Sequence, residues 1–270
     1  MTLIDQIWLT QLEKLTQTGS FTSPRGRVTQ ELLNQTITIN MKMPVLGVKS
    51  RNLSYRFMFA EARWILDGDE QADTIVPYNL RLAEFSDDGK IFAGAYGPKI
   101  KAQLPYIVDT LLRDPDSRQA GLTIWKPSPP FSKDIPCTVA MWFVIRENTL
   151  TTHVFMRSSD VWLGLPYDLF NFSMVSYLVT AKLYGHGLVI APGLLHLTMV
   201  SSHLYQQDFS KAINILTEHD YMLNCYTFQP LNKILWQSET KLFEFLRLMQ
   251  DKNRLAILQT LSFIPGEGDE

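Results

Sequence analysis

The sequence is poor in cysteine and has no excess of either charge, and each shortage excludes a class of protein. Its two cysteines are Cys137 and Cys225. Together with the lack of a signal-peptide pattern at the polar N-terminus, they predict a reduced, cytoplasmic protein. Lys and Arg total 25 against 27 for Asp and Glu, so no basic surface predicts a nucleic-acid partner. A few local arginines would still suffice to bind a small anion such as one phosphate.

Long apolar runs and metal-ligand spacings are also missing. No apolar run approaches the roughly 18–20 residues of a membrane span, so we expect no membrane partner. The glycines of residues 89–97 are spaced wrongly for a dinucleotide-binding fingerprint and follow no strand pattern. We interpret Cys225 as a small buried hydrophobe. We also predict no metal, because four histidines do not form a ligand spacing with the cysteines: His153, His186, His196 and His219.

The remaining composition is that of a globular protein, with 46% apolar and 19% charged residues. No repeat or linker divides the chain, which favours one α+β domain over residues 1–270. Periodicity predicts helices at 3–18, 52–67, 98–112, 169–184, 203–218 and 239–261. Strand patterns occur at 36–39, 120–125, 137–146, 150–157, 188–190 and 194–200. Residues 19–26 read as a turn-rich loop, and residues 262–270 have a composition typical of disorder.

Glu61 lies within the apolar helix predicted at 52–67, which Asn52 or Ser54 would cap and Gly68 would end. A buried carboxylate is costly unless it is paired. Glu61 is therefore either paired with Arg63 or another cation, or kept for chemistry.

A thiol and an arginine mark the stretch from Pro136 to Asn171. Cys137 stands between a proline and a predicted strand, and Arg157 follows twenty residues later among polar neighbours that strands rarely carry. A thiolate is a strong nucleophile, and an arginine can bind a phosphate with two parallel hydrogen bonds. This pattern predicts a nucleophile beside an anion site.

Several motifs in this order resemble the thymidylate synthase superfamily, between about residues 20 and 209. They are Glu61-Ala62-Arg63-Trp64, Tyr96-Gly97, Ser117-Arg118 with Trp125, Pro136-Cys137, Arg157-Ser158-x-Asp160-x-x-x-Gly164-x-Pro166, and Ser202-His203-Leu204-Tyr205. The resemblance implies a mixed β-sheet with packed helices and a sheet-to-sheet homodimer in which each active site borrows Arg118 from the partner. It also implies a pyrimidine 5′-monophosphate and 5,10-methylenetetrahydrofolate as substrates, with no metal.

The resemblance further assigns roles to individual residues. Cys137 would add to C6 of the pyrimidine, Glu61 would organise water and proton transfers, and Asp168 and Tyr96 would complete the catalytic group. The phosphate would bind Arg25, Arg118, Arg157 and Ser158. His203 and Tyr205 would hold the sugar, and Asp160 and Gly164 the folate. Hydride transfer would then give a methyl group and dihydrofolate, whereas water would give a hydroxymethyl group and leave tetrahydrofolate.

One departure from the synthase pattern concerns the base. Asp168 stands where synthases have an Asn that matches uracil. A carboxyl group can accept from the amino group of cytosine and share a proton with its N3. Deoxycytidylate hydroxymethylases resemble this sequence at Asp168 and at Cys137-Thr138. A second interpretation of Asp168 is an N-cap for the helix predicted at 169.

Other departures concern phosphate and folate. Gln119 follows Arg118 where synthases have a second arginine, and Arg25 or Arg27 could replace it; we prefer Arg25, although both could simply be solvated charges. The synthase C-terminal ending that closes over the folate is missing, which is compatible with water addition. Between Asp69 and Asp88 the synthase tryptophans are absent, which leaves Tyr78 and Phe85 as the local aromatics.

These features predict a cytidylate 5-hydroxymethylase. The alternatives are a dUMP hydroxymethylase, a thymidylate synthase, or a non-catalytic nucleotide-binding homologue. The choice between CMP, which suits nucleoside antibiotics, and dCMP, which suits the modified DNA of some phages, stays open.

Overall fold

A computed structural model describes residues 2–129, 131–218 and 224–262. These residues build a six-stranded mixed sheet in the order β1-β2-β6-β5-β4-β3. Neighbouring strands are antiparallel except for β5 and β6, which are parallel. The strands are β1 (Ser20–Thr22), β2 (Thr29–Asn40), β3 (Gly121–Thr123), β4 (Thr138–Arg146), β5 (Thr149–Asp160) and β6 (Ala191–Tyr205). The fold is α+β, as the sequence predicts.

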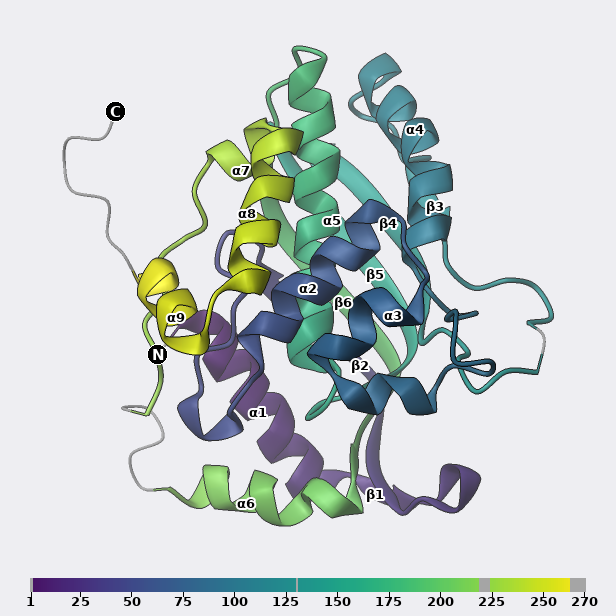
Figure 1. The fold of residues 1–270 in the computed structure, drawn as a ribbon, viewed down its shortest axis with the longest axis vertical. Helices are drawn as coiled ribbons and strands as arrows, with labels where there is room; N and C mark the ends of the chain where they lie inside the picture. Colours follow the sequence, from purple (N-terminus) through teal and green to yellow (C-terminus); the bar gives the residue numbers. More distant parts are fainter. Residues whose placement is uncertain (1, 130, 219–223, 263–270) are drawn as a thin grey trace.

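The helices pack on the sheet and on one another. They are α1 (Leu3–Thr18), α2 (Tyr55–Asp67), α3 (Ala72–Ile75), α4 (Gly97–Arg113), α5 (Leu165–Gly185), α6 (Phe209–Thr217), α7 (Ile234–Gln237), α8 (Glu239–Asp251) and α9 (Arg254–Ser262). In Figure 1, α2, α5 and α8 lie in front of the sheet, and α4 runs beside them near β3. Helix α2 contacts α4, α5 and α8, so the segment that carries Glu61 lies in the interior.

The parallel pair β5 and β6 is joined by α5, as parallel strands require a crossover connection. Helix α5 is apolar on nearly all sides, and most of its residues are buried. One of its polar side chains bonds the sheet directly: Ser176 Oγ lies 2.7 Å from Thr152 Oγ1 of β5. This packing fixes α5 over the strands that carry the predicted phosphate and sugar residues.

Local signals of the sequence are confirmed at two turns. The strands predicted at 137–146 and 150–157 form the hairpin of β4 and β5, which turns at Glu147 and Asn148. The φ angles of these two residues are 50° and 54°, as a tight hairpin turn requires. Helix α2 is capped by Ser54, whose side chain accepts from the N–H of Phe57. The helix ends at Gly68 with a φ of 76°, in the left-handed region that glycine tolerates best.

Several predicted boundaries were wrong, most of them around β2 and β6. The strand expected at 36–39 extends over all of β2, the strand expected at 194–200 extends over all of β6, and residues 188–190 precede β6 without forming a strand. The loop expected at 19–26 contains β1, and the helix expected from 203 begins at Phe209. Continuous pairing between β2 and β6 overrides the local propensity of their polar residues.

The helical tail is confirmed by α8 and α9. Disorder was wrongly expected at Ser262, which ends α9, and residues 263–270 lie outside the described residues. Among the described helices, none combines the length and hydropathy needed to cross a membrane.

The end of α2 offers a test of the backbone argument. Gly68→Ala should lower the free energy of unfolding by about 1–2 kcal/mol, because an L-residue is strained in the left-handed region. The added Cβ would also meet the side chain of Lys101. Chemical denaturation measures the change. The control is Gly185→Ala in α5, whose Cβ would meet nothing within 4 Å; an equal loss in both variants would contradict the argument.

Candidate active site

A cavity of about 1110 Å³ opens between α2, the start of α5 and the ends of β5 and β6. It is lined by every predicted site residue except Arg118, namely Arg25, Glu61, Tyr96, Cys137, Arg157, Ser158, Asp160, Gly164, Asp168, His203 and Tyr205. These residues come from seven separate parts of the chain. The fold therefore brings together the side chains that the motifs singled out.

Cys137 stands immediately before β4, half-buried on the cavity wall. Ser158 Oγ lies 3.5 Å from its sulfur, and the N–H of Arg157 donates to its carbonyl at 2.8 Å. Burial raises the pKa of the Cys137 thiol, while the charge of Arg157 and the contact with Ser158 oppose this rise. The site thus supplies the thiolate with a cation and a hydrogen-bond donor.

Arg157 connects the Cys137 segment to β5. Its Nε donates to the carbonyl of Pro136 at 3.0 Å, its Nη2 to the carbonyl of Ile135 at 2.9 Å, and its Nη1 to Ser158 Oγ at 3.1 Å. The guanidinium also lies over the ring of Trp125, 5.9 Å from its centroid. Because an arginine has five N–H donors, two remain for an anion. Arg157 both fixes the thiol and keeps a charge in the cavity.

The thiol should respond to the charge of Arg157. Arg157→Gln should slow alkylation of Cys137 by iodoacetamide about tenfold at pH 7.5, because loss of the cation raises the pKa of the thiol and lowers the thiolate fraction. The measurement uses a Cys225→Ala background. Arg157→Lys, which keeps the charge, is the matched control, and equal rates for the Gln and Lys variants would contradict the electrostatic argument.

Glu61 does not pair with Arg63. Arg63 pairs instead with Asp67, with Nε and Oδ2 3.2 Å apart. Glu61 Oε2 accepts a hydrogen bond of 2.8 Å from the side-chain amide of Asn171 in α5. Burial raises the pKa of Glu61 to about 7, although the Asn171 bond lowers it. A carboxyl with this pKa can take up or release a proton near neutral pH.

Asp168 is not an N-cap. Helix α5 begins at Leu165, and the N–H of Asp168 donates to the carbonyl of Gly164 within the first turn. Burial raises the pKa of Asp168 well above its ordinary value, and the charges of Glu61 and Asp160 add to this rise. The neutral carboxyl is thereby favoured, and it can both donate and accept a hydrogen bond.

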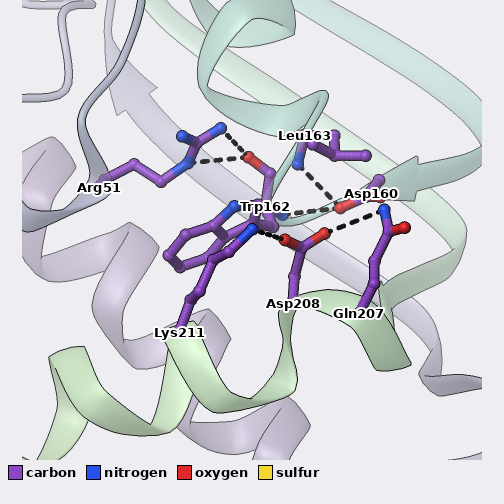
Figure 2. A network of polar contacts seen from close by, with 7 residues as sticks. All are labelled: Arg51, Asp160, Trp162, Leu163, Gln207, Asp208 and Lys211. Atoms are coloured by element: carbon purple, nitrogen blue, oxygen red, sulfur yellow. Dashed lines mark hydrogen bonds and ion pairs between the residues drawn. The ribbon is translucent and has the colours of Figure 1, made fainter.

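Asp160 ends β5 and caps the turn that follows it (Figure 2). Its Oδ1 accepts from the N–H of Trp162 at 2.8 Å and of Leu163 at 2.9 Å. Its Oδ2 is buried and has no hydrogen-bond partner among the described residues. Burial raises the pKa of Asp160 to about 6, in spite of the two backbone hydrogen bonds. Asp160, which lines the cavity, thus keeps Oδ2 as an unused hydrogen-bond acceptor.

Arg51 supports this turn from one side, and Asp208 lies close to it on the other, where its charge adds to the rise in the pKa of Asp160. Arg51 Nε donates to the carbonyl of Trp162 at 3.0 Å, and its guanidinium lies 4.7 Å from the Trp162 ring centroid. On the other side, Asp208 is buried and binds Lys211 Nζ at 2.7 Å, as Figure 2 shows. Arg51 also lines the cavity. The turn that carries Asp160 is therefore held by Arg51 and by the two backbone hydrogen bonds to Asp160 Oδ1.

The far end of the cavity is lined by β6 and the loop before β2. His203 and Tyr205 are two residues apart on β6, and their rings meet edge to face at 5.2 Å. His203 Nδ1 is buried without a partner in the described chain, and burial lowers the pKa of this imidazole. Arg25 and Arg27 both line this end, so the choice between them as a phosphate ligand stays a prediction.

Arg118 is the predicted residue that lies outside the cavity. It is exposed on the connection between α4 and β3, and it does not line the cavity of its own chain. Tyr96, by contrast, lies on the wall beneath Cys137, where its hydroxyl accepts from the N–H of Thr138 at 3.3 Å.

Two residues of the site were missed from the sequence, Arg51 and Asn171. Asn171 follows Asp168 by three positions, which places both on one side of α5, and this spacing was the available signal. Arg51 gave no comparable signal, because its role depends on the fold around Trp162. Within the described ranges, no group of three or more His, Cys, Asp or Glu side chains could hold a metal ion.

Residues 6–245 match the family model described as thymidylate synthase. The chain belongs to the thymidylate synthase family. The matched region extends beyond residues 20–209, which the motifs covered.

A curated relative is a deoxyuridylate hydroxymethyltransferase of Bacillus phage SP01. It is 26% identical to this chain over 246 residues, which cover 82% of this chain and 62% of the phage protein. The chain thus spans less than two thirds of the length of that relative.

Proposed function

We propose that this chain is a folate-dependent pyrimidine nucleotide hydroxymethyltransferase that acts on the cytosine of CMP or dCMP. The carboxyl group of Asp168, buried in the same cavity as Cys137, carries the choice of base. Membership of the thymidylate synthase family supports one-carbon transfer to a pyrimidine monophosphate. The relative named as a hydroxymethyltransferase supports water addition as the final step.

Asp168 suits cytosine for a chemical reason. A neutral carboxyl group donates its proton to N3 and accepts from the 4-amino group, and an ionised one still accepts from the amino group. Burial favours the neutral form of Asp168, so both the N3 and the 4-amino group of cytosine can be hydrogen-bonded by this one carboxyl group.

Cys137 begins the reaction by adding its sulfur to C6 of the pyrimidine, which makes C5 nucleophilic. Ser158 and the free N–H groups of Arg157 hold the 5′-phosphate, with Arg25 at the rim. His203 and Tyr205 hold the sugar. These roles follow from the shared cavity and from the donors that the protein leaves unused.

The residues beside Asp160 fit a folate. Asp160 Oδ2, a buried acceptor without a partner in the described residues, would receive the N–H groups of the pterin. Tyr78, Phe85 and Gly164 line the same cavity and would border the rings. Methylenetetrahydrofolate supplies the one-carbon unit, and Glu61 would move protons and orient the water that completes the hydroxymethyl group.

A second candidate is hydroxymethylation of dUMP. The relative's name gives deoxyuridylate as its substrate, and a neutral Asp168 could donate to O4 of uracil. For either base we propose a homodimer in which Arg118 of one chain binds phosphate in the site of the other, because Arg118 lies outside its own cavity.

Product identification tests the proposal. The protein is incubated with CMP, dCMP, UMP or dUMP and methylenetetrahydrofolate, and products are identified by mass. A gain of CH2O on a cytidine nucleotide is expected, without dihydrofolate absorbance. Methylation of dUMP alone with dihydrofolate formation would indicate a synthase. If there is no turnover and Cys137 forms no adduct with a 5-fluoropyrimidine nucleotide, the chain is a binding protein.

Base choice should depend on Asp168. Asp168→Asn should shift the ratio of kcat/KM for cytosine over uracil nucleotides by about tenfold or more toward uracil, because an amide matches uracil N3–H and O4. Competition between CMP and UMP, and between dCMP and dUMP, measures this ratio. A ratio that stays unchanged would remove Asp168 from base recognition.

Folate binding should depend on the unpaired oxygen of Asp160. Asp160→Asn keeps an oxygen for the N–H groups of Trp162 and Leu163 but replaces the free acceptor by a donor. The KM for methylenetetrahydrofolate should rise by about tenfold or more, with a nearly unchanged nucleotide KM. Thermal melting checks that the turn remains intact. Equal increases in both KM values would contradict a specific folate contact.

A further inference from the structure

Asn171 is a buried amide on α5, with 3% of its surface exposed, and it contacts Glu61 of α2. Its Nδ2 donates to Glu61 Oε2 at 2.8 Å across 110 positions of sequence. Among the described residues, its Oδ1 is buried and has no partner. Within the described residues, the bond to Glu61 is therefore the one hydrogen bond of this side-chain amide, and it joins two helices that both border the cavity.

A buried amide is costly unless hydrogen bonds compensate it. Asn171 makes one such bond, and it leaves its acceptor without a partner in the described part of the chain. A hydrogen bond to an ionised carboxylate is stronger than one to a neutral group. The amide is thus best compensated when Glu61 carries its charge.

The bond also distinguishes the two oxygens of Glu61. Oε2 is held by Asn171, whereas Oε1 has no hydrogen-bond partner within the described ranges, and Glu61 lines the cavity. Asp168 lies one turn before Asn171 on α5 and also lines the cavity. One side of α5 thus carries both Asp168, which faces the proposed site of the base, and Asn171, which holds Glu61.

We propose that Asn171 is a positioning residue, which holds Oε2 of Glu61 so that Oε1 is presented to the cavity for proton transfer and for orienting water. This role rests on the proposed one-carbon transfer, in which Glu61 acts as an ionised carboxylate.

The ionisable groups around Glu61 influence its pKa, which a substitution of Asn171 would change. Tyr167 and Asp168 of α5 interact electrostatically with Glu61, and Tyr96 and Cys137 face the same cavity. Burial raises the pKa of Glu61, and the bond from Asn171 is what lowers it. Removing the amide should therefore raise the pKa of Glu61 and shift its ionisation to higher pH.

The first test measures Glu61 directly and needs no turnover. The protein is labelled with glutamate carrying 13C at the side-chain carboxyl, and the Glu61 signal is assigned by its loss in Glu61→Gln. Asn171→Ala should raise the pKa of Glu61 by about one unit. The matched control is Ser173→Ala, which removes a buried hydroxyl bonded within α5 and should leave Glu61 unchanged.

The second test measures activity against pH with the nucleotide that the wild type uses. In Asn171→Ala the acidic limb of the kcat profile should move to higher pH by the same amount as the pKa of Glu61. A merely structural role would instead lower kcat at every pH. Asn171→Ser, whose hydroxyl can still donate, is the second variant should the alanine variant fail to fold, and its expected shift is smaller. An unmoved Glu61 pKa in a folded variant overturns the proposal. A wild type without turnover would instead refute the proposed function, while the titration still decides the role of Asn171.

Discussion

The parallel pairing of β5 with β6 is the constraint on which the site depends. Parallel strands cannot be joined by a tight turn, so the chain must cross over through α5, and the crossover is tightly buried. This arrangement places Asp160 of β5 opposite His203 of β6. It also directs the first turns of α5, with Asp168 and Asn171, toward α2 and Glu61. One crossover unit therefore provides both ends of the cavity.

The cavity combines buried carboxyl groups with an arginine, Arg157, some of whose N–H groups already bond the protein itself. Burial raises the pKa of Glu61, Asp160 and Asp168, and none of the three forms an ion pair among the described residues. Arg157 uses three of its N–H groups on the protein itself. The carboxyl groups are thus available for proton transfer and neutral hydrogen bonding, while one fixed positive charge remains close to Cys137.

Residues with a local chemical signature were predictable from the sequence, and residues defined by tertiary contacts were not. Pro136-Cys137 and the Arg157 motif could be located because their types and order are unusual in strands. The end of α2 at Gly68 followed from backbone chemistry alone, which also narrowed its cap to Asn52 or Ser54, of which the structure has Ser54. Strand β6 was divided in two, and Glu61 was assigned Arg63 as an alternative partner, because sheet pairing and the Asn171 contact join segments far apart in sequence. Arg51 was missed for the same reason.

In the reaction that we propose, base choice and the fate of the one-carbon unit would depend on different parts of the cavity. Asp168 is suited to the edge of the base, but a carboxyl there has no direct influence on whether water or hydride completes the reaction. Water addition instead requires a polar, accessible region beside Glu61, whose oxygen Oε1 is left without a partner in the described chain. The phage relative is named for deoxyuridylate and for hydroxymethyl transfer, so that name combines hydroxymethyl transfer with uracil rather than cytosine. The two properties are therefore separable, and we propose that Asp168 accounts for the first of them.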